Sequence, residues 1–185
     1  MKKYSPIQSG WQRTYESASM KIFGIAGYSG SGKTTLIERV LPLLTERGLT
    51  VSVIKHTHHD FDIDRPGKDS WRAREAGAVA VLLASDHRTA LLIEHHDAPP
   101  ALDSLLAQLP PCDLVLVEGY KREPIPRLEV HRAETAKPWL FPDDPHILAA
   151  ASDEAPPDDF PRIDLDAVQQ LADFIQTHAL SYPAP

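Results

Sequence analysis

The sequence predicts an α/β domain in which helices flank a mainly parallel β-sheet. Short apolar runs recur along the chain, stretches of helical period separate several of them, and a glycine-rich turn joins the first run to the first helix. Buried parallel strands read as continuous apolar runs, and their alternation with helices is typical of parallel sheets. Two further apolar runs that a tight turn joins predict a β-hairpin within the same domain.

Length and composition limit the class of protein. The 185 residues are enough for one domain with its own core, and the net charge of −7 argues against sequence-independent nucleic-acid binding, which needs a basic face. The single cysteine, Cys112, has no partner for an intramolecular disulfide, so we expect a reducing, cytoplasmic location. No apolar run is long enough to span a bilayer, so we expect no membrane association.

The two ends of the chain differ from its middle. Residues 1–19 are polar and aperiodic, and no apolar segment of a signal peptide follows Lys2 and Lys3. We expect a disordered extension over residues 1–19, a single domain over 20–180 and a frayed tail over 181–185.

The first strand and the turn after it form the strongest motif. Residues 21–26 form a short apolar run, and residues 27–35 read GYSGSGKTT, which fits Gly-x-x-x-x-Gly-Lys-Thr, the phosphate-binding P-loop. Gly27, Gly30 and Gly32 allow backbone angles that a Cβ would forbid, so their amides can converge on an anion. A helix-period stretch follows directly and adds the positive end of its dipole. The context therefore predicts a nucleotide phosphate site.

Two side chains of this motif carry specific chemistry. Lys33 brings a positive charge to the β- and γ-phosphates of a nucleotide, and the Thr34 hydroxyl is a hard oxygen suited to Mg²⁺. We also consider Lys55, which ends a second strand over residues 50–55 and which we expect beside the P-loop strand. The chain between these strands crosses over through the predicted helix, which Gly48 ends.

The next stretch is polar and open to several interpretations. Residues 56–70 hold three histidines and several acids, namely His56, His58, His59, Asp60, Asp62 and Asp64. They can be read as a Zn or Ni site, as contacts to nucleotide or partner, or as a solvated loop; the spacing lacks the His-x-x-x-His pattern of helical metal sites. Asp69 either caps a helix over residues 70–76, which Gly77 ends, or serves as a second acid near the metal.

The middle of the chain contains the predicted hairpin and a second nucleotide-binding motif. Residues 79–84 and 89–94 predict the two strands of the hairpin, and a short helix follows Asp97. Residues 113–119 then read DLVLVEG, an apolar strand that ends in Glu118 and a glycine. Such a segment is either an ordinary core strand or a Walker B strand whose acid holds Mg²⁺, and the P-loop upstream favours the second interpretation.

The last third predicts further strands and a helix. Residues 127–130 and 147–151 predict two more short strands, and we expect a final helix from Asp164 with Val168, Leu171, Ala172 and Ile175 on its apolar face. No Asn-Lys-x-Asp guanine motif is present. Asp153, at the end of the strand over 147–151, is our candidate to read a base, because a carboxylate accepts hydrogen bonds from guanine N1 and N2, which adenine cannot match.

Three segments resemble the molybdopterin-guanine dinucleotide biosynthesis adapter proteins, the MobB family. They are residues 27–35, residues 54–70 and the stretch that runs from 116–121 to 126–130. The resemblance spans residues 20 to about 153. It implies a P-loop protein that binds Mg²⁺ and GTP, hydrolyses GTP slowly at best, and forms a homodimer. Its implied partners are the guanylyltransferase that joins GMP to molybdopterin and molybdopterin-carrying proteins.

The motifs and the resemblance together define the candidate site. The candidate nucleotide-binding residues are Gly27, Gly30, Ser31, Gly32, Lys33, Thr34, Thr35, Lys55 and Asp153. The candidate metal ligands are Thr34, Glu118 and Asp69. Some relatives place a second lysine early in the P-loop, where this chain has Tyr28 and Ser29. We therefore expect no activation by a P-loop lysine from across a dimer, and no general base is evident for fast hydrolysis.

Two other functions remain open at this stage. A small-molecule kinase or ligase on the same fold would need a second substrate pocket, for which we consider His58, Asp62 and Lys68. A metallochaperone GTPase would instead use the histidines to carry a metal.

Overall fold

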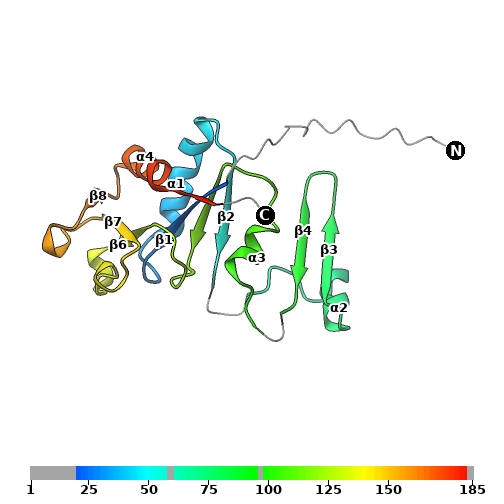
Figure 1. Cartoon of the computed structure of the whole chain (residues 1–185). Coiled ribbons are helices and arrows are strands. Elements are labelled where there is room, and N and C mark those ends of the chain that lie inside the picture. The colour runs from blue at the N-terminus through cyan, green and yellow to red at the C-terminus, as the bar shows by residue number, and fades with distance from the viewer. Residues whose placement is uncertain (1–19, 58–60, 96–97, 183–185) are drawn as a thin grey trace.

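The structure is a computed structural model that describes residues 20–57, 61–95 and 98–182 (Figure 1). Its main sheet has the strand order β2-β5-β1-β6-β7-β8, with parallel pairing throughout this order, and β9 pairs antiparallel with β1. The strands are β1 (Met20–Ala26), β2 (Val51–Lys55), β5 (Leu114–Glu118), β6 (Arg127–His131), β7 (Ile147–Ser152), β8 (Arg162–Asp164) and β9 (Leu180–Tyr182). The predicted mainly parallel α/β fold is confirmed.

Helices cover both faces of this sheet. The helices α1 (Lys33–Glu46) and α4 (Val168–His178) bury their apolar sides in one cluster with Phe23 and Leu116. The helix α3 (Leu102–Leu106) closes a smaller cluster on the opposite face with Val115. Side chains alternate between the two faces along each strand, so β1 and β5 supply both clusters and are buried on both sides.

The hairpin forms a separate two-stranded sheet. The strands β3 (Ala80–Ala84) and β4 (Thr89–Ile93) pair antiparallel, with Leu82 opposite Leu91, so the predicted hairpin is confirmed. Helix α2 (Asp69–Glu75) packs against β3. In Figure 1 the hairpin and α2 stand to one side of the main sheet, beyond α3.

Short 3₁₀ turns occur in the connections that follow β6 and β7. They are η1 (Ala133–Thr135), η2 (Phe141–Asp143) and η3 (Pro157–Asp159). None of the helices in the described part of the chain is both long and apolar enough to cross a bilayer.

Four details of the sequence-based prediction are wrong. Strand β5 lies between β1 and β2, so Lys55 does not end a strand directly beside the P-loop strand. Asp164 ends β8, a strand too short to show a pattern, and α4 begins only at Val168. Ser181 belongs to β9 and to the sheet, whereas residues 183–185 of the predicted tail and the predicted extension over residues 1–19 lie outside the described residues. Asp69 is the first residue of α2 and not its cap, which is Lys68 in extended backbone.

Candidate functional site

The P-loop connects the end of β1 to the start of α1 in the conformation that its glycines predict. Gly30 and Gly32 have φ values of 83° and 93°, in the left-handed region that side chains with a Cβ rarely adopt. Gly27 is held more tightly, because a Cβ there would lie 2.5 Å from the Val130 carbonyl oxygen. Gly30, Thr34 and Thr35 are exposed, so this side of the loop is open to a ligand.

The amine of Lys33 rests on the P-loop itself. Its Nζ donates a hydrogen bond to the Tyr28 carbonyl oxygen at 2.8 Å. Burial lowers the pKa of this amine, the Glu118 carboxylate opposes that shift, and Lys121 and Lys55 add to it by repulsion between like charges. A polyanion at the loop would satisfy these positive charges.

Ser31 provides a test of whether the loop fits a phosphate. Its side chain is 2% exposed, and Ser31 Oγ finds no hydrogen-bond partner among the described residues. Buried polar atoms are normally paired, and leaving one unpaired costs about 1–3 kcal/mol. A phosphate oxygen that accepts from this hydroxyl would remove that cost, so the residues present fit a nucleotide tail.

Three side chains meet beside the start of α1. Lys55 Nζ lies 3.3 Å from Thr34 Oγ1 and 3.4 Å from Glu118 Oε2. Strand β5, which carries Glu118, pairs directly with β2, and the register of this pair sets Lys55 opposite Glu118. Glu118 is only 7% exposed. A hydroxyl and a carboxylate beside a P-loop are ligands that Mg²⁺ accepts, so this pair fits a divalent metal.

The structure does not bring Asp69 to this group. Asp69 is exposed at the start of α2, and Figure 1 shows α2 under the hairpin, well apart from the loop between β1 and α1. The local pattern that marks a helix start is the same for a structural acid and for a metal ligand, so the sequence alone did not separate the two roles.

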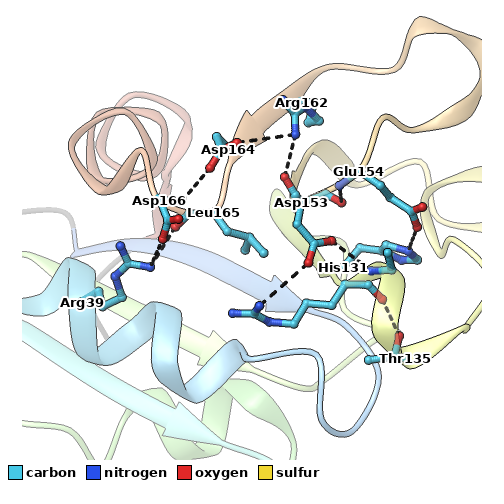
Figure 2. Close-up of polar contacts among 12 residues, drawn as sticks. Arg39, His131, Thr135, Asp153, Glu154, Arg162, Asp164, Leu165 and Asp166 are labelled. Carbon is cyan, nitrogen blue, oxygen red and sulfur yellow. Dashed lines mark hydrogen bonds and ion pairs between the residues drawn. The ribbon is translucent and has the colours of Figure 1, made fainter.

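Asp153 lies at the end of β7, on the other side of the P-loop strand (Figure 2). Its Oδ1 accepts a hydrogen bond from the Ala133 amide at 2.9 Å, and its Oδ2 lies 3.9 Å from Arg132 Nη1. The same arginine reaches the P-loop, because a Cβ built on Gly32 would lie 3.1 Å from Arg132 Nε. Arg132 is not among the candidate site residues that we named from the sequence. Its place directly after a strand of the sheet was the signal that could have suggested it.

A second polar group on this side is structural. His131 Nε2 lies 2.7 Å from Glu154 Oε1, as Figure 2 shows, and the His131 ring stacks on Trp139 with centroids 3.7 Å apart. Glu129, on the same strand, accepts hydrogen bonds from the amides of Leu140 and Phe141. These contacts fix the proline-rich loop after β6 against the sheet.

The polar stretch after β2 is engaged mainly in ion pairs. Arg74 of α2 contacts Asp62 at 3.0 Å, Asp64 at 3.4 Å and Glu94 at 2.5 Å. The described residues contain no group of three His, Cys, Asp or Glu side chains that is arranged to hold a metal ion. His58, His59 and Asp60 lie outside the described residues, so the histidine hypothesis rests on positions that are not described here.

A cavity of about 480 Å³ adjoins the site on the hairpin side. Lys55, His56 and Tyr120 line the end near Glu118, and Asp62 and Leu91 belong to its far wall. Of the residues that we considered for a second substrate pocket, Asp62 lines this cavity, Lys68 does not, and His58 is outside the described residues.

Comparisons with known proteins agree with this geometry. Residues 22–153 match the family model described as molybdopterin guanine dinucleotide synthesis protein B, MobB. The adapter proteins for molybdopterin-guanine dinucleotide biosynthesis from Haemophilus influenzae and Escherichia coli are 48% and 40% identical to this chain, over 84% and 83% of it and over 87% and 90% of their own lengths. A crystal structure of molybdopterin-guanine biosynthesis protein B superposes with a TM-score of 0.67 at 34% identity, over 84% of this chain and 98% of that one. The chain therefore belongs to the MobB family.

Proposed function

We propose that this protein binds GTP with Mg²⁺ and, as an adapter, assists the transfer of GMP to molybdopterin. The observation that carries the proposal is the open P-loop with Lys33 at its base and the buried, unpaired Ser31 hydroxyl. The family relationship adds the pathway, because the relatives named above are adapter proteins of molybdopterin-guanine dinucleotide biosynthesis.

Each element of the site has a definite part in this binding. The amides at Gly30 and Gly32, the N-terminus of α1 and the Lys33 ammonium group bind the phosphates. Thr34 and Glu118 would hold Mg²⁺, which neutralises phosphate charge when bound. Lys55 now bridges these two side chains, and we expect it to turn to the phosphates once the metal is present.

The base is assigned to the β7 side of the loop. The Asp153 carboxylate contacts the Ala133 amide and Arg132, which hold it in place. Its oxygens can accept further hydrogen bonds, and guanine offers the matching N–H donors. We name no general base, so we propose slow hydrolysis at most and the role of an accessory protein to a guanylyltransferase. Molybdopterin-carrying proteins are further proposed partners.

We also propose that the chain acts as a cytoplasmic homodimer. Leu82 and Leu91 are paired across the hairpin and are 64% and 49% exposed. Exposed apolar side chains that lie together on one face favour association with another surface. A second copy offers the same face, as a two-fold interface requires.

Calorimetric titration of the full chain with GTP and with ATP, with and without Mg²⁺, tests the nucleotide proposal. We expect GTP to bind more tightly than ATP, with affinity that depends on Mg²⁺ and falls by about a hundredfold in Lys33→Ala, since a buried charge-assisted contact is lost. Lys21→Ala is the matched control, because Lys21 is an exposed lysine near the start of β1, at the end of that strand away from the P-loop. No affinity for any nucleoside triphosphate would overturn the proposal.

A further inference from the structure

The loop that follows β5 carries a lysine to the P-loop. Lys121 Nζ lies 5.4 Å from the centroid of the Tyr28 ring, within the range in which an ammonium group is attracted to an aromatic face. Tyr28 is the residue whose carbonyl oxygen receives Lys33. The ammonium groups of Lys121 and Lys33 therefore approach the same P-loop residue from two different elements.

The position of Lys121 is built into the fold and does not depend on its side chain alone. Arg127 is 1% exposed, and its Nη1 donates to the Lys121 carbonyl oxygen at 2.7 Å and to Asp144 Oδ2 at 2.6 Å. Its Nη2 donates to the carbonyl oxygen of Glu123. The two hydrogen bonds from this buried guanidinium to carbonyl oxygens of the loop fix the backbone from which Lys121 extends.

The backbone before Lys121 is also constrained. Gly119 has a φ of 99°, and a Cβ there would lie 2.8 Å from the Cβ of His56. Tyr120 adopts a φ of 48°, which is uncommon for a residue with a side chain. This turn directly follows Glu118, so the segment that supplies the candidate metal ligand also directs Lys121 back to the P-loop.

We propose that Lys121 is a second ammonium group for the terminal phosphate of the bound nucleotide, held over the P-loop by the Tyr28 ring and by Arg127. Lys33 is repelled by the positive charges of both Lys55 and Lys121, whereas the carboxylate of Glu118 attracts it. A terminal phosphate dianion between them removes that repulsion. Lys121 thus places a positive charge next to Tyr28 from the loop after β5 of the same chain.

This assignment rests on the proposed function, and a comparison of two nucleotides tests it separately. In Lys121→Met, which keeps the aliphatic length and removes the charge, we expect the affinity for Mg-GTP to fall by about tenfold or more, as for a lost charge-assisted contact. Mg-GDP lacks the γ-phosphate, which is the terminal phosphate of GTP, so the affinity for Mg-GDP should change by less than about twofold. Calorimetry on the full chain measures both, and equal thermal midpoints show that the variant is folded.

Two further variants separate phosphate binding from a surface role. Arg122→Met removes the positive charge of the next residue, which is also exposed, and should leave both affinities within about twofold. Lys121→Arg keeps a cation that stacks on aromatic rings and should retain most of the GTP affinity. Tyr28→Ala should lose part of the GTP affinity, because it removes the ring that contacts the Lys121 ammonium group.

The contrary outcomes are equally clear. If Lys121→Met and Arg122→Met have the same affinity for GTP, Lys121 is a surface lysine and the proposal is overturned. If Lys121→Met weakens GDP as much as GTP, the lysine serves another phosphate and the assignment is wrong. If the wild-type chain binds neither nucleotide, the proposed function and this assignment both fail, whereas tight GTP binding with an inert Lys121 removes the assignment alone.

Discussion

The main sheet buries its apolar side chains, whereas the β3–β4 hairpin leaves several of them exposed. All residues of β5 are buried, and Leu116 has no exposed surface. In the hairpin, Leu82 and Leu91 remain 64% and 49% exposed on one face. A sheet with helices on both faces completes its own core, whereas a two-stranded hairpin is marginal unless something covers it. We therefore assign the proposed nucleotide site to the sheet and the proposed dimer surface to the hairpin.

Removal of a core leucine should have the largest effect and is the most direct test of this contrast. Leu116→Ala leaves a cavity between α1 and the sheet and should lower the free energy of unfolding by about 3 kcal/mol. Leu82→Ala removes the same atoms from the hairpin and should change it by less than about 0.5 kcal/mol in the monomer. Urea denaturation at low protein concentration measures both values. Similar losses would show that the hairpin is part of the core.

Polar substitutions in the hairpin should affect assembly instead. In the double variant Leu82→Ser, Leu91→Ser, we expect dimer affinity to fall by roughly thirtyfold or more, because apolar area from both copies is lost from the interface. Sedimentation equilibrium over a range of concentrations measures the change. Leu148→Ser is the control, since Leu148 is a leucine 37% exposed on β7 of the main sheet. An unchanged dimer in the hairpin variant would place the interface elsewhere.

The contrast also explains which parts of the structure were predictable from the sequence. The P-loop, β5 and the hairpin follow from local patterns, because glycines, apolar runs and tight turns reflect the conformation of the chain over a few residues. The fold class was predictable for the same reason, since alternating strands and helices leave few arrangements. The metal-binding role of Glu118, which we inferred from its place at the end of an apolar strand, stays a prediction; the structure shows the contact of its carboxylate with Lys55.

The remaining features depend on contacts between distant segments. Insertion of β5 between β1 and β2 is a choice among strand orders that no local pattern encodes. Strand β9 is short and partly polar, and only its pairing with β1 defines it. Arg132, the residue after β6, reaches the P-loop; its place after a strand puts it at the sheet edge, but the sequence does not show which loop it approaches there. Arg127 reads as an ordinary charged residue, although it is buried to hold backbone carbonyl groups.

Substitution of Asp153, the candidate base-reading acid, tests the part that we assign to the main sheet. Asp153→Asn keeps one acceptor for the Ala133 amide but loses the carboxylate that would accept two guanine donors. We expect the preference for GTP over ATP to fall by about tenfold, with the free energy of unfolding nearly unchanged. Competition titrations with both nucleotides measure the preference. Glu154→Gln changes the adjacent acid and should keep it; an unaltered preference in Asp153→Asn would remove this residue from base recognition.

The smallest expected effect concerns a charge that the sheet buries. Glu129 has no exposed surface, and burial raises the pKa of its carboxyl group despite the amide hydrogen bonds from Leu140 and Phe141. The folded chain then holds this proton more tightly than the unfolded chain, so the contribution of Glu129 to stability is greatest at low pH. It decreases as the pH rises from the unfolded value of about 4.3 through the raised folded pKa.

Glu129→Gln removes this titration and isolates its contribution. The unfolding free energy of the wild type minus that of the variant should decline as the pH rises above about 4 and become constant once Glu129 is ionised in the folded chain. Denaturation curves at intervals up to about pH 7 measure the difference. A difference that stays constant, or that grows with pH, would mean that the two amide donors outweigh burial. In that case the hydrogen bonds from the loop after β6 are enough to stabilise this buried charge. The interior of the main sheet would then be less strictly apolar than its contrast with the hairpin implies.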